Sequence, residues 1–89
     1  MSASEITKRQ WDYALAVKRL HEQDDRPPTL REIAEHMGVT LGTVQEKMAL
    51  LRDRGVLTWE DGKARTLQLL VPDDDFITYN DLHAKEDLW

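Results

Sequence analysis

The first part of the chain repeats hydrophobic residues at the spacing of three helices. Apolar residues recur every three or four positions in residues 8 to 22, in residues 30 to 37 and between Thr40 and Gly55, which is the period of an amphipathic helix. The stretch "RPP" separates the first two helices, because proline cannot continue a helix and restricts the residue before it. Gly38 separates the second and third, where a left-handed turn suits glycine.

A capping residue marks the start of each predicted helix. Thr7 with Gln10, and Thr29 with Glu32, have the spacing of a capping box, in which each side chain binds the backbone N–H of the other residue. Thr40 offers its hydroxyl to the start of the third helix. The helix boundaries therefore rest on start signals as well as on periodicity.

The period changes after Gly55 from helical to extended. The run "VLTWEDGKARTLQLL" holds two β-prone segments around Asp61-Gly62, a strong hairpin signal. Trp59 in this run is expected to pack over the hydrophobic core rather than to stack on a base. The order of elements predicts a mainly α fold with a small β-hairpin, a three-helix winged helix-turn-helix, as one domain over residues 1 to 71.

The negative charge of the chain is concentrated near its C-terminal end. The 89 residues have a formal net charge of −5, but residues 1 to 71 carry 11 Lys/Arg and 11 Asp/Glu, whereas residues 72 to 89 hold six acids against Lys85. A neutral domain can bind DNA if its cations gather on one face, because attraction to phosphate is screened over about 10 Å. The acidic balance therefore does not exclude DNA.

Other classes of function find little support in the residues. The chain has no cysteine, which excludes disulfides and thiolate metal sites. His21, His36 and His83 share no metal-ligand spacing, and "DDDFITYND" lacks the glycine of a calcium-binding loop. There is no acid–base pair or nucleophile arrangement, and no signal peptide or membrane span. We expect a non-enzymatic, cytoplasmic protein without metal or cofactor.

The spacing of the second and third helices predicts a surface that reads DNA. Ala34 is small where the two helices cross, and Val39 and Val44 anchor the third helix so that its first residues project outward. A helix held in this way fits the major groove. A three-helix domain with a purely structural or protein-binding use also needs a small residue, a glycine and valines, so that alternative stays open.

Four segments carry a family resemblance: "ITKRQ", "PPTLREIAEHMG", "RGVLT" and "ARTLQLL". Over about residues 6 to 71 the chain resembles the N-terminal DNA-binding domain of LexA-type repressors, although the spacing from Gly38 to Gly55 is one residue shorter than usual. The resemblance implies a third helix in the major groove of a palindromic operator and a wing on the backbone. The implied base-facing residues are Thr40, Leu41, Gly42, Thr43, Gln45 and Glu46, of which Glu46 matches a family glutamate.

One part of that family's chemistry is not expected in this chain. LexA-type repressors continue into a self-cleaving peptidase domain with a Ser/Lys pair, which normally also provides dimerisation. Here the only serines are Ser2 and Ser4. We therefore expect no self-cleavage and no dimerisation of that kind.

The chemistry of the third helix indicates how bases would be read. Gln45 can pair with adenine, Glu46 can accept a hydrogen bond from cytosine N4, and Thr40 and Thr43 offer hydroxyls. No arginine lies in this stretch. Guanine recognition would therefore need Lys47 or a residue of the wing.

Phosphate contacts are expected at the edges of this surface. The candidates are Thr29 and Arg31 at the start of the second helix, Arg52 near the end of the third, and Lys63 and Arg65 on the hairpin. The alternative for each cation is a solvated surface charge. That alternative is weaker for Lys63 and Arg65, because charges at a hairpin tip have little structural purpose.

The acidic tail, residues 72 to 89, carries more apolar residues than a solvating segment needs. We expect it to dock on a second copy of the chain or on another protein, with a short helix capped by Thr78 or Asn80. The alternatives are a tail folded back on its own domain and a disordered tail. The apolar residues are Phe76, Ile77, Tyr79, Leu82, Leu88 and Trp89.

Two functions of different class follow from these features. The first is a small transcriptional regulator, above all a repressor, that binds double-stranded DNA as a homodimer on an inverted repeat. The second is a winged-helix interaction module that binds a transcription or replication protein. The two functions differ in whether the domain prefers a particular DNA sequence.

Overall fold

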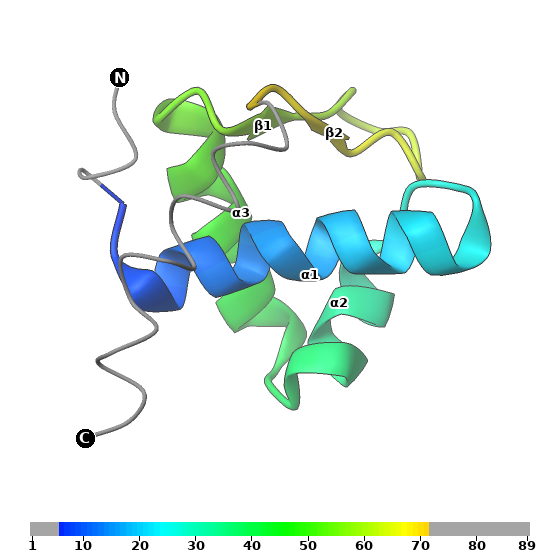
Figure 1. Cartoon of the computed structure of the whole chain (residues 1–89), viewed down its shortest axis with the longest axis horizontal. Helices are drawn as coiled ribbons and strands as arrows, with labels where there is room; N and C mark the ends of the chain where they lie inside the picture. Colours follow the sequence, from blue (N-terminus) through cyan, green and yellow to red (C-terminus); the bar gives the residue numbers. More distant parts are fainter. Residues whose placement is uncertain (1–5, 72–89) are drawn as a thin grey trace.

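The computed structural model describes residues 6–71, which form three helices and a two-stranded antiparallel sheet. The elements are α1 (Lys8–Asp24), α2 (Leu30–Met37), α3 (Leu41–Asp53), β1 (Leu57–Thr58) and β2 (Gln68–Leu69). In Figure 1, α1 runs across the front of the molecule, with α2 below it, α3 behind it and the sheet above. The predicted winged helix-turn-helix is confirmed.

The described residues test some of the predictions and not others. The C-terminal segment, residues 72–89, lies outside them, so its short helix and its apolar contacts stay predictions. Within residues 6–71, no helix is long and apolar enough to cross a membrane. The same residues contain no group of three side chains placed to hold a metal ion.

All three helices begin at the predicted caps. Complete capping boxes are present at Thr7 and at Thr29, and the side chain of Thr40 caps α3. The end of α1 was predicted two residues too early, since the helix runs to Asp24. The restriction by Pro27 falls on the residue directly before it, which leaves the preceding charged residues free to continue the helix.

A glycine in the left-handed conformation ends α2, as predicted. Gly38 has a φ of 70°, and the carbonyl oxygen of Ala34 accepts a hydrogen bond from its N–H. The same carbonyl accepts the N–H of Val39 at 3.0 Å. The turn therefore satisfies the Ala34 carbonyl near the end of α2 while it redirects the chain into α3.

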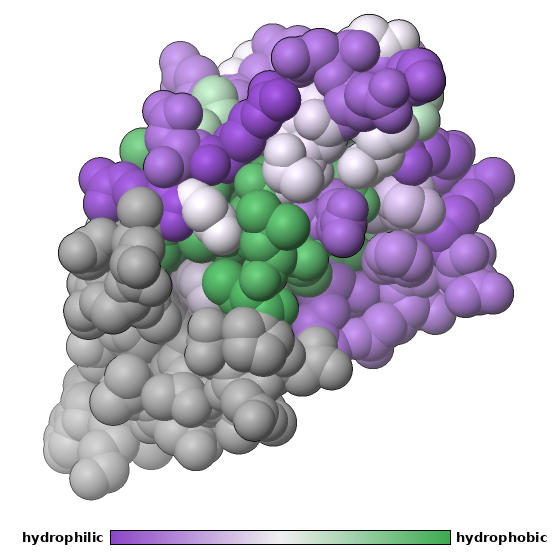
Figure 2. All heavy atoms as spheres, turned by 90° about the horizontal axis from the view of Figure 1, so that it is seen from above, coloured by the Kyte–Doolittle hydropathy of each residue, from purple (hydrophilic) through white to green (hydrophobic). Residues whose placement is uncertain are grey.

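The hydrophobic core joins all three helices to the sheet. Its largest fully buried side chains include Trp11, Tyr13, Ile33, Met48, Leu51 and Leu57. Figure 2 views the molecule from above, and shows hydrophobic side chains in the middle of that face with hydrophilic side chains above them and to their right. Because the buried stripe of α3 is Val44, Met48 and Leu51, the opposite face of this helix is turned outward.

The hairpin after α3 is less regular than the sequence predicted. Leu57 pairs with Leu69 and Thr58 pairs with Gln68, and the ladder goes no further. Residues 59–67 therefore form a long connection, which we call the wing loop. The two β-prone runs around Asp61-Gly62 are thus paired only at residues distant from the turn.

Side-chain hydrogen bonds replace the missing strand pairs. The backbone N–H of Glu60 donates to the Thr66 hydroxyl oxygen at 2.9 Å, and this hydroxyl lies 3.2 Å from the carbonyl oxygen of Lys63. The turn itself is where the sequence predicted it, because the Lys63 N–H donates to the Glu60 carbonyl at 3.2 Å and Gly62 has a φ of 79°. Local side-chain bonds of this kind compete with a regular ladder.

Candidate nucleic-acid interface

The outward face of α3 and the residue that caps it carry the seven residues predicted to read bases. Val44 beside them is fully buried and anchors the helix. Five of the seven are exposed and two are half-buried, so all are accessible from outside. The exposed residues are Thr40, Leu41, Gly42, Gln45 and Glu46, and the half-buried ones are Thr43 and Lys47. Their assignment to particular bases stays a prediction.

The first turn of α3 presents a largely apolar surface. Thr40 uses its hydroxyl oxygen to accept the Thr43 N–H at 3.3 Å, and the two hydroxyl oxygens lie 3.0 Å apart in a hydrogen bond. The Leu41 side chain is 39% exposed. A Cβ built on Gly42 would meet nothing within 4 Å. This turn therefore offers open space and an exposed leucine, a surface suited to a thymine methyl group.

The next residues of α3 hold polar side chains that are not used within the domain. Gln45 and Glu46 are exposed, and Lys47 is half-buried. With the other residues of the 6–71 segment, these three side chains form neither hydrogen bonds nor ion pairs. Their donors and acceptors can therefore bind a partner without first breaking an internal contact.

Three of the five residues predicted to contact phosphate have polar groups that a DNA phosphate could reach from solvent. Arg31 is exposed and forms no ion pair with any residue from 6 to 71. Thr29 is half-buried, and its hydroxyl accepts the Glu32 N–H at 3.1 Å. Lys63 pairs with Glu60 at 2.9 Å, but both side chains are more than half exposed. An exposed pair of this kind is weak, at about 0–1 kcal/mol, so Lys63 can exchange its partner.

Arg52, the fourth candidate, is used inside the domain. Its guanidinium carbon lies 4.3 Å from the centroid of the Trp59 ring, and one nitrogen donates to the Trp59 carbonyl at 3.3 Å. The other terminal nitrogen lies 3.2 Å from the Asp61 carboxylate, which also accepts the Trp59 indole N–H at 2.9 Å. Trp59 packs against the core, as predicted. The arginine therefore joins the last turn of α3 to the wing loop.

Arg65, the fifth candidate, lies against the start of α2. Its Nη1 donates to Glu32 Oε1 at 2.8 Å and to the Pro27 carbonyl at 3.2 Å. The two paired side chains are only 33% and 30% exposed. The expectation that this charge has little structural purpose is wrong, because Arg65 sits beyond the hairpin tip, on the side that faces α2.

The Glu32 carboxylate is held by two donors. Its Oε1 accepts the Thr29 backbone N–H at 2.8 Å as well as the Arg65 guanidinium. The Thr29 N–H, and after it Arg65, hold the pKa of Glu32 below its ordinary value. The carboxylate is therefore charged at neutral pH and fixed in position.

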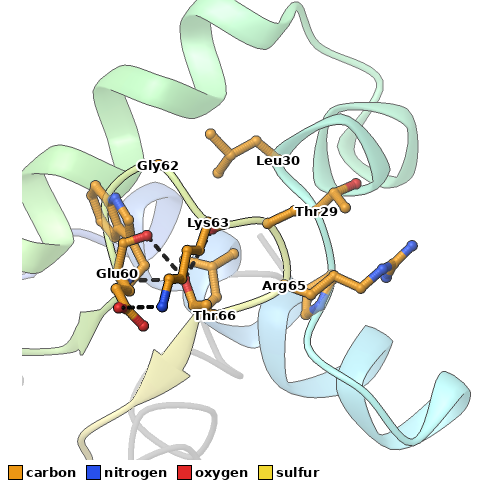
Figure 3. A pocket seen from close by; sticks show the side chains of 11 residues that line it. Thr29, Leu30, Glu60, Gly62, Lys63, Arg65 and Thr66 are labelled. Carbon is orange, nitrogen blue, oxygen red and sulfur yellow. Dashed lines mark hydrogen bonds and ion pairs between the residues drawn. The ribbon is translucent and has the colours of Figure 1, made fainter.

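An open pocket separates the wing loop from the start of α2. It has a volume of about 320 Å³, and its apolar lining includes Pro28, Leu30 and Trp59. In Figure 3, Glu60 and Gly62 of the wing loop lie across the pocket from Leu30, and Arg65 points away from Lys63. The wing loop is therefore not packed directly against α2 along this side.

Comparisons with known proteins agree with this geometry. The family described as LexA DNA binding domain matches residues 3–66. A LexA repressor of Sorangium cellulosum is 36% identical over 64 residues, which cover 71% of this chain and 28% of the relative. LexA repressors of Listeria welshimeri and Listeria monocytogenes are 32% identical over 76 residues, which cover 84% of this chain and 37% of theirs. The chain spans about a third of the length of these relatives. It belongs to the LexA DNA-binding domain family.

Proposed function

We propose that this chain binds double-stranded DNA in a sequence-specific manner, as a transcriptional repressor, through α3 in the major groove. The observation that carries the proposal is the outward face of α3, where Gln45 and Glu46 are exposed and form no hydrogen bond or ion pair with other described residues. The relatives named LexA repressor support the same function. A rigid helix with unused donors and acceptors is what base reading in the major groove requires.

Each side chain of this face has a partner of matching chemistry. Gln45 presents an amide for adenine, and Glu46 presents an acceptor for cytosine N4. Leu41 supplies apolar contact for a thymine methyl group, and Lys47 supplies a donor for guanine. A good base contact contributes about 1–3 kcal/mol of discrimination.

Phosphate contacts would place the domain on the DNA. Arg31 and Thr29 at the start of α2 and Lys63 on the wing loop are the groups best able to reach a phosphate. Arg31 has no described ion-pair partner, and Lys63 has only an exposed one. Such contacts supply affinity that depends on salt and not on sequence.

Two copies on an inverted repeat would provide the affinity that one copy lacks. One α3 reads only a few bases, whereas two half-sites add their contacts. We propose that the apolar residues of the segment 72–89 join the two copies. Sedimentation of the full chain and of a chain that ends at Val71 tests this point, because equal association states would exclude the segment as the dimer contact.

Selection of binding sites from random DNA tests the function itself. The full chain should enrich one sequence and hold it against a large excess of competitor DNA in a mobility-shift titration. Glu46→Ala should change the enriched sequence. No binding even at low salt would reject the proposal, and capture of a transcription or replication protein by such a chain would favour the interaction module.

A further inference from the structure

We propose that Arg65 is a positioning residue, which fixes the wing loop against α2 through Glu32 and does not itself bind phosphate. The inference rests on the proposed DNA-binding function. It assigns a different role to Arg65, which the sequence analysis predicted to contact phosphate. It concerns how the wing is brought to the DNA backbone. Arg52 acts in the same way at the other side of the loop.

The contacts of Arg65 join segments that are far apart in the sequence. One guanidinium nitrogen reaches both Glu32 on α2 and the Pro27 carbonyl just before α2. Glu32 is itself fixed by the Thr29 N–H, so the acceptor cannot follow a moving wing. The pair therefore ties the wing loop to the part of the helix-turn-helix that precedes the DNA-reading helix.

Little else holds the wing loop on this side. The β-ladder has only two residue pairs, and the loop lies outside it. A pocket of about 320 Å³ lies where side-chain packing between the loop and α2 would otherwise be. Trp59 and Leu67 anchor the two ends of the loop on the core, and between these ends the loop is held by two arginine contacts, Arg52 with Asp61 toward α3 and Arg65 with Glu32 toward α2.

The backbone at Arg65 favours the same interpretation. Arg65 has a φ of 59°, in the left-handed region that glycine occupies most easily. A residue with a side chain is disfavoured there, so favourable contacts of that side chain have to offset the strain. Those contacts are the hydrogen bonds to Glu32 and Pro27.

A phosphate would have to compete with a fixed carboxylate for Arg65. Glu32 Oε1 lies 2.8 Å from the guanidinium, and both side chains are about two-thirds buried. If Arg65 moved to a phosphate, it would leave the Glu32 charge without its partner near the DNA. Lys63, which is 66% exposed, can reach a phosphate without this penalty.

Two matched substitutions separate positioning from phosphate binding. Glu32→Gln removes the charge but keeps an oxygen for the Thr29 N–H, as Gln10 does for Thr7 in α1. Arg65→Gly removes the side chain and suits the positive φ, so the domain should stay folded. Affinity of the full chain for its selected DNA is measured for both variants and for the double variant, over a series of salt concentrations.

If Arg65 is a positioning residue, the two substitutions should weaken DNA binding in a non-additive way and leave its salt dependence unchanged. Each single variant should bind roughly three- to tenfold more weakly, and the double variant should bind no more weakly than the worse single one. The slope of log K against log salt should stay unchanged, because the loosened loop still brings Lys63 to its phosphate in the complex at the cost of being ordered, whereas Lys63→Gln should reduce the slope by about 1. Hydrogen exchange at the Lys63 N–H, bonded to Glu60, should be faster in both single variants.

Phosphate binding predicts a different set of results. Arg65→Gly would then reduce the salt slope by about 1, and Glu32→Gln would bind as well as the unmodified chain or better. Either these results, or variants that bind DNA as well as the unmodified chain, would overturn the positioning role of Arg65 and leave the proposed DNA-binding function standing. If the unmodified chain bound no DNA at low salt, the proposed function would fail instead.

Discussion

Arg52 lies over the indole ring of Trp59, and a single carboxylate, that of Asp61, accepts hydrogen bonds from both. The contact joins the last turn of α3 to the wing loop. Arg52→Ala should lower the free energy of unfolding by about 1 kcal/mol, because it removes a cation–π contact and the cover over the ring. Denaturant unfolding measures this change.

Arg31→Ala is the control for that measurement. Arg31 is exposed and has no ion-pair partner among the described residues, so its loss should change the unfolding free energy by less than about 0.5 kcal/mol. Equal stability of the two variants would show that the contact of Arg52 with Trp59 contributes nothing measurable.

Two glycines of the helix-turn-helix should respond to substitution in opposite directions. Gly38 has a φ of 70°, and a Cβ added there would meet nothing within 4 Å, so the effect of Gly38→Ala is backbone strain alone. We expect a loss of about 1–2 kcal/mol, and a larger loss for Gly38→Val. Gly42 lies within α3 without a positive φ. Gly42→Ala should therefore raise stability by about 0.5–1 kcal/mol.

Thermal unfolding of these variants checks the turn. A Gly38→Val protein that melted like the unmodified domain would show that the left-handed turn is not at Gly38. If Gly42→Ala were less stable than the unmodified domain, the conclusion that a Cβ fits at this position without a clash would be wrong.

The Glu32 carboxylate should make stability depend on acid pH. Its pKa in the folded domain is below the ordinary value of about 4.5, because the Thr29 N–H and Arg65 favour the charged form. The stabilisation is therefore complete above pH 4.5 and is lost as the pH falls through the lower folded pKa. Glu32→Gln should be less stable than the unmodified domain at neutral pH, and the difference should shrink below pH 4.5. A difference that stayed constant down to pH 3 would contradict this assignment.

Base reading and phosphate contact should separate in DNA-binding measurements. Gln45→Ala and Glu46→Ala should change which sequence is preferred, since both residues lie on the face proposed to meet base edges. Lys63→Ala should weaken binding to all sequences alike and reduce the salt slope by about 1. If Lys63→Ala changed base preference while Glu46→Ala changed nothing, the proposed docking of α3 would be wrong.

The helix-turn-helix could be predicted from the sequence because its signals are local. Thr29 with Glu32 caps α2, and Gly38 ends it, all within one short segment. The wing could not be predicted to the same degree. Its turn at Gly62 is a local signal, but its hydrogen bonds to Thr66 interrupt the ladder that β-propensity alone would extend.

The roles of the cations depend on contacts that no local pattern contains. Arg65 and Glu32 pair across 33 positions of sequence. Arg52 meets Asp61 only because the chain turns back on itself after α3. Nothing in the sequence distinguishes Arg31 and Lys63 from these two arginines. In the structure, however, Arg31 has no ion-pair partner among the described residues, and Lys63 has only the exposed Glu60.

The shortness of β1 and β2 also bears on how this domain behaves at high concentration. An exposed sheet edge can recruit a strand from another molecule, and long flat edges are common starting points for aggregation. Each strand here has only two residues. Within residues 6–71, the sheet therefore offers too little free edge to template an intermolecular ladder.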